Sequence, residues 1–114
     1  MTKVCVLLAI VCFVMAGCEK KSARDGDETG MSAQAQRGER VFKMQCAICH
    51  NAHTIEPLHG PGMKGLYKRQ ELPSGVSLTD EHVQQTIQHG RNMMPPIPLD
   101  QSQIEDVIVY LKTL

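Results

Sequence analysis

Two cysteines and a histidine, Cys46, Cys49 and His50, lie together in one short segment of the chain. Two thiols at this spacing can form thioether bonds to the two vinyl-derived carbons on one edge of a porphyrin. The imidazole next to them can then bind the iron from the proximal side. The C-x-x-C-H pattern therefore indicates a c-type haem, with Cys46 and Cys49 as the attachment residues and His50 as an iron ligand.

Other chemistries also use a C-x-x-C pair. A thioredoxin-like redox pair belongs to a βαβ unit, but this chain has no alternating strand pattern. A structural zinc site needs four ligands, so His53 and His59 would have to complete it. A plain disulfide forms in oxidising compartments, but it would leave the long loop that follows with nothing to enclose. The haem interpretation accounts for more of the sequence than these three.

A second motif offers a ligand for the other side of the iron. Met93 and Met94 directly precede a pair of prolines. Because proline restricts the residue before it to extended backbone, Met94 would present its sulfur from a stiff segment. Most methionines only fill space in a core, and Met93 is an alternative ligand in the same turn. We predict that Met94 is the distal ligand.

Three segments have the pattern of helices that could position these groups. Apolar residues recur at helical spacing from 33 to 49. Thr79 is the predicted N-cap of a second helix that Gly90 ends, and Asp100 begins a third helix. The connection 51–77 is rich in Gly and Pro and too long to stay empty in a small domain. The predicted fold class is all-α, with three main helices and long loops around one covalent haem.

The N-terminal segment has the features of an export signal. An uncharged run over residues 4–17 follows a short basic start. As a helix it would reach only about 21 Å, less than the roughly 30 Å of bilayer hydrocarbon. Met15 to Cys18 resembles the lipobox of bacterial lipoproteins, in which the cysteine receives the lipid. We predict a lipoprotein-type signal peptide at 1–17, a flexible tether at 18–32 from lipidated Cys18, and a folded domain at 33–114.

Composition limits the function classes. A chain of 114 residues is enough for one small domain. Its 12 basic and 12 acidic residues leave no net positive field to hold nucleic acid. Export and lipidation would place the domain at the bacterial periplasm or another extracytoplasmic face, held to its membrane by acyl chains.

Several motifs, in the expected order, resemble class I cytochrome c of the compact bacterial type over residues 36–114. They are Gly38 with Phe42, the segment Cys46 to His50, Gly60 to Tyr67, Gly90 with Met94-Pro95, and Ile108 to Lys112. The resemblance implies one haem c, ligation by His50 and Met94, and a hydrogen bond from His50 to the Pro61 carbonyl. It also implies that Gly38 allows the first and last helices to approach closely.

Two protein ligands on the iron would leave no position for a small-molecule substrate, which favours electron transfer. The leading prediction is a membrane-anchored, non-enzymatic carrier between respiratory-chain partners. The alternative is a small haem subunit fixed in an oxidase or reductase. A sensor or peroxidase with a weak bond to Met94 is a third possibility, which carbon monoxide binding to the reduced protein would reveal.

Overall fold

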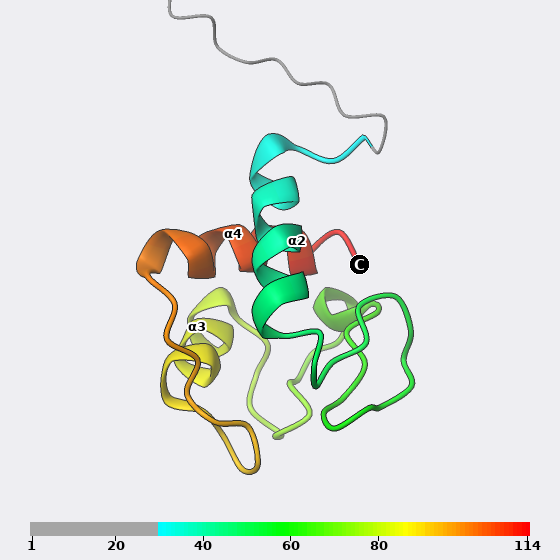
Figure 1. Ribbon diagram of the computed structural model, residues 1–114. Coiled ribbons are helices and arrows are strands. Elements are labelled where there is room, and N and C mark those ends of the chain that lie inside the picture. The colour runs from blue at the N-terminus through cyan, green and yellow to red at the C-terminus, as the bar shows by residue number, and fades with distance from the viewer. Residues whose placement is uncertain (1–29) are drawn as a thin grey trace, which may run out of the picture.

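The computed structural model describes residues 30–114, in which helices are joined by long loops (Figure 1). The helices, with the labels of Figure 1, are α2 (Ala33–Gln45), the 3-10 helix η2 (Leu66–Lys68), α3 (Asp80–His89) and α4 (Gln101–Leu111). Extended pairing within residues 30–114 is limited to two isolated bridges, Glu71 with Ser77 and Arg91 with Met94. The predicted all-α fold with three main helices is confirmed.

Other predictions lie outside the described residues or differ from the structure. The signal peptide, Cys18 and most of the tether lie outside the described residues. No helix within 30–114 combines the length and the apolar character that crossing a bilayer requires. The first helix is shorter than predicted, because α2 ends at Gln45 and residues 46–49 form turns instead.

Side-chain oxygens cap the N-termini of α2, α3 and α4. Ser32 accepts a hydrogen bond from the Ala35 N–H, and Thr79 accepts one from the His82 N–H, each at 3.1 Å. Asp100 forms a capping box, in which its carboxylate accepts from the backbone of Gln103 and the Gln103 side chain bonds back. These bonds satisfy N–H groups that have no partner within the helix, which explains why α2, α3 and α4 begin where they do.

The central contact of the fold is the crossing of α2 and α4. A β-carbon on Gly38 would overlap the backbone carbonyl of Asp106 and lie 2.8 Å from Cβ of Tyr110. Beside it, Arg37 donates two hydrogen bonds of 2.8 and 3.0 Å to the carboxylate of Asp106. The ring of Phe42 meets Tyr110 edge to face, with centroids 5.5 Å apart. The absence of a side chain at Gly38 thus allows the helices to approach closely enough for these contacts.

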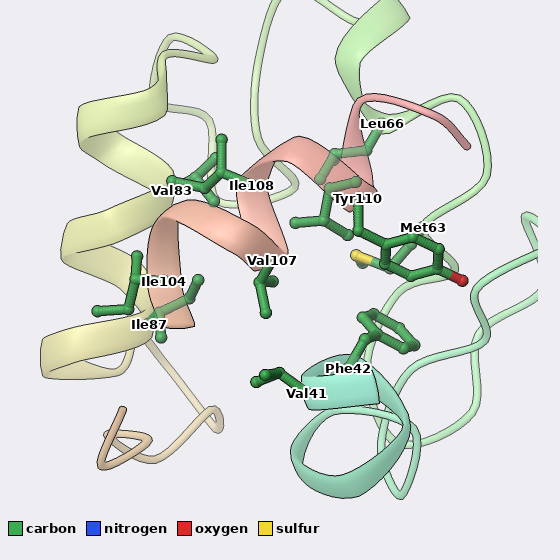
Figure 2. Packing of buried hydrophobic residues seen from close by; sticks show 11 residues of the cluster. Val41, Phe42, Met63, Leu66, Val83, Ile87, Ile104, Val107, Ile108 and Tyr110 are labelled. Atoms are coloured by element: carbon green, nitrogen blue, oxygen red, sulfur yellow. The ribbon is translucent and has the colours of Figure 1, made fainter. Parts of the chain in front are cut away.

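Apolar side chains extend the core to both sides of α4. Figure 2 shows Val83 and Ile87 of α3 on one side of α4, and Phe42 of α2 with Met63 on the other. Ile104 and Val107 on α4 are almost completely buried between them. The helical core therefore holds the starts of the loops that carry the candidate site.

Candidate haem-binding site

The cysteine pair lies on a single turn that follows α2. Cys46 caps the helix, and its N–H donates to the Phe42 carbonyl at 2.8 Å. The N–H groups of Cys49 and His50 then both donate to the Cys46 carbonyl, at 3.0 and 2.9 Å. The turn brings the two cysteines close together, and their thiols interact electrostatically. Each thiol is half-buried and free of any disulfide.

Burial affects the protonation of the first thiol. It raises the pKa of Cys46 to about 11, and the neighbouring Cys49 contributes to the rise. The neutral thiol therefore predominates at neutral pH. The reactive thiolate form is therefore rarer at Cys46 than at an ordinary exposed thiol.

The imidazole of His50 is held by the loop that contains Pro61. Its Nδ1 lies 2.9 Å from the Pro61 carbonyl oxygen. Since a carbonyl oxygen can only accept, the N–H is on Nδ1 and the lone pair of Nε2 remains available for a metal. The backbone of Gly60 lies against the ring, because a β-carbon there would be 2.5 Å from Cε1 and 2.9 Å from Nδ1. The Nδ1 of His50 and the Pro61 carbonyl oxygen are the pair that the family resemblance implies. Their hydrogen bond and the contact with Gly60 hold the ring in one orientation.

Backbone hydrogen bonds attach this loop to the turn that contains Cys46 and Cys49 and to the residues after it. The N–H of Gly60 donates to the Cys49 carbonyl, and that of Met63 donates to the Asn51 carbonyl, both at 2.8 Å. Arg69 adds a side-chain anchor, because its Nη2 donates to the carbonyls of Gly62 and Lys64 at 3.3 Å. This anchoring contact was not predicted from the sequence, since an arginine beyond a Gly-Pro loop carries no local signal of it.

The other candidate ligand lies on a tight turn after α3. Arg91 and Met94 exchange backbone hydrogen bonds in both directions, each 2.9 Å long. Met94 is half-buried and packs against the core, whereas Met93 is 93% exposed. The turn therefore directs one methionine inward and its neighbour into solvent.

These donors come from two separate loops. In Figure 1 the chain leaves the lower end of α2 as the green loops and the lower end of α3 as the gold loop. No group of three or more His, Cys, Asp or Glu side chains within residues 30–114 is arranged to hold a metal ion. The zinc interpretation thus lacks its further ligands in this part of the chain. Two reduced thiols, a free imidazole nitrogen and an inward thioether instead fit a haem.

Comparison with protein families identifies the kind of domain that contains these residues. The profile of the family described as cytochrome c oxidase, cbb3-type, subunit III matches residues 33–111. The chain belongs to this family. The matched region is a cytochrome c domain, which carries covalently bound haem c and transfers electrons. A comparison with curated proteins returned no match.

The cbb3-type subunit III match spans α2, α3 and α4 and all the candidate site residues described above. The sequence-based resemblance to cytochrome c is therefore confirmed at the level of the domain. The particular ligands, the number of haems and the membrane anchor stay predictions.

Proposed function

We propose that the chain transfers single electrons between respiratory-chain proteins through one haem held by Cys46 and Cys49. His50 and Met94 are the proposed axial ligands. The observation that carries this proposal is the hydrogen bond between His50 Nδ1 and the Pro61 carbonyl, 2.9 Å long, beside two free thiols. With the Nδ1–H donated to this carbonyl, the Nε2 lone pair would be available to iron, an arrangement that a plain disulfide or redox pair does not need. A haem bound here supplies one-electron chemistry by cycling between ferrous and ferric iron.

The protein residues adjust that chemistry. The Pro61 carbonyl accepts a hydrogen bond from the Nδ1–H of His50, which would make Nε2 a stronger electron donor to iron. A thioether ligand from Met94 raises the reduction potential relative to a second histidine. With both axial positions taken by protein, the reduced form should not bind carbon monoxide at neutral pH, which distinguishes a carrier from a sensor or peroxidase.

A matched pair of substitutions tests the distal ligand. Met94→Ala should abolish the far-red sulfur-to-iron absorption band and lower the reduction potential. Met93→Ala removes the same side chain from the adjacent, exposed position and should leave both properties unchanged. The opposite pattern would assign the ligand to Met93. If both variants keep the band, the ligand is not a methionine of this turn.

Membrane anchoring is a further part of the proposal. Its support is the uncharged run over residues 4–17, whose end, Met15-Ala16-Gly17 followed by Cys18, resembles a lipoprotein signal. A lipid on Cys18 would confine the domain to the extracytoplasmic membrane surface and raise its effective concentration near membrane-bound partners. Cys18→Ser should then move the haem-loaded protein from the membrane to the soluble fraction, and an unchanged distribution would refute lipidation.

The family match favours a second candidate function. Because the family is described as a subunit of an oxidase, this chain is also a candidate for a haem subunit fixed in such a complex. Purification from membranes in mild detergent separates the two functions. A carrier is extracted from the membrane without partner proteins. A subunit copurifies with its oxidase in constant proportion.

A further inference from the structure

We propose that Asn92 is a positioning residue, which holds Met94 in the geometry that binds iron. The proposal rests on ligation by Met94, as proposed above. Asn92 touches no reacting atom itself, and its side chain is exposed to solvent. It acts through the backbone of the turn from Arg91 to Met94.

The conformation of Asn92 is the first observation. Its φ is +53°, and it is the one residue other than glycine with positive φ within residues 30–114. Residues with a β-carbon avoid this left-handed region, while asparagine and glycine enter it most easily. The turn around Asn92 has only two central residues, because Arg91 and Met94 exchange two backbone hydrogen bonds of 2.9 Å. Turns with two central residues that are closed by such a hydrogen-bond pair favour positive φ at the first central residue.

The second observation is how few backbone hydrogen bonds hold the segment that carries Met94. Pro95 and Pro96 follow it and have no N–H to donate. After Met94, the next backbone N–H that donates a hydrogen bond to a backbone carbonyl belongs to Ile97. Its acceptor is the Ile87 carbonyl, at 2.9 Å. The turn closed by Asn92 is therefore the nearest backbone anchor for the ligand.

Gly90 provides contact on the other side of the segment. A β-carbon on Gly90 would overlap the Met94 carbonyl and lie 2.8 Å from the Pro96 nitrogen. The backbone of Met94 is thus confined between the Asn92 turn and the Gly90 backbone. Opening the turn releases one of these two restraints and frees the thioether, while α2, α3 and α4 keep their own contacts.

The experiment compares the haem-loaded protein with Asn92→Ala, Asn92→Gly and Met94→Ala. Guanidinium titrations follow the far-red sulfur-to-iron band and, separately, helix content by far-UV circular dichroism. An alanine disfavours positive φ, so the equilibrium constant for losing the band should rise about tenfold in Asn92→Ala at a given guanidinium concentration. The helix transition should stay within the spread of the wild type, and Asn92→Gly should restore the band.

Three results would overturn the proposal. The first is an Asn92→Ala band as stable as that of the wild type, while Met94→Ala lacks the band. The second is an equal shift of the band and the helix transition, because Asn92 would then act only on overall stability. A band that persists in Met94→Ala is the third, and it refutes ligation by Met94 and hence the proposed function itself.

Discussion

Replacing Gly38 by alanine should force α2 away from α4 and lower the free energy of unfolding. The new β-carbon would overlap the backbone carbonyl of Asp106, so no side-chain rotation can relieve the clash. Overpacking of this kind costs about 1–3 kcal/mol or more, and we use the upper end because the neighbour is helix backbone. Alanine in place of glycine returns about 1 kcal/mol of helix propensity. The net expected loss is about 2 kcal/mol from these two opposing effects.

Thermal unfolding of the haem-loaded protein, followed by far-UV circular dichroism, measures this loss. For a domain of this size, 2 kcal/mol corresponds to a fall in Tm of about 8–16 °C. Arg40→Ala is the matched control, because it shortens an exposed side chain two positions along the same helix. It should change stability by no more than about 0.5 kcal/mol. If the Tm of Gly38→Ala equals that of Arg40→Ala, the close approach of α2 and α4 is not what holds this core.

Two further predictions concern the site and its support. Gly60→Ala places a β-carbon 2.5 Å from His50 Cε1, so it should turn the imidazole. The visible spectrum and the reduction potential of the haem-loaded protein should then change. An unchanged spectrum would contradict the contact. The pKa of Asp80 is held below its usual range chiefly by a hydrogen bond from Lys112, 2.6 Å long. A carboxylate of this kind stabilises the fold above its unfolded-state pKa of about 4, and the contribution is lost as pH falls through the folded-state pKa. Lys112→Met should therefore lower stability at neutral pH by at most about 0.5 kcal/mol, since both side chains are exposed, and the deficit should vanish in strongly acidic solution. Unfolding titrations at both pH values check this, and a deficit independent of pH would refute it.

Local signals were sufficient for most of the fold. Thr79 and Asp100 were predicted as N-caps, and both cap helices in the structure. The predicted end of the first helix was wrong, because the backbone leaves the helical pattern directly after Gln45. The Ala47 N–H donates to the Phe42 carbonyl, five residues back, and residues 46–49 form turns. The helical pattern thus continues in the sequence past the point where α2 ends.

The sequence by itself determined the prediction of a covalent haem, because this prediction depends only on the residue types and spacing from Cys46 to His50. It also determined the helix starts, since an N-cap acts within three residues. Tertiary structure alone decided that Met94 faces the core and Met93 the solvent, and that Arg69 braces the loop beside Pro61. The proline after Met94 favoured that residue in the sequence, but the orientation of both side chains and the contact of Arg69 depend on segments far apart in the chain.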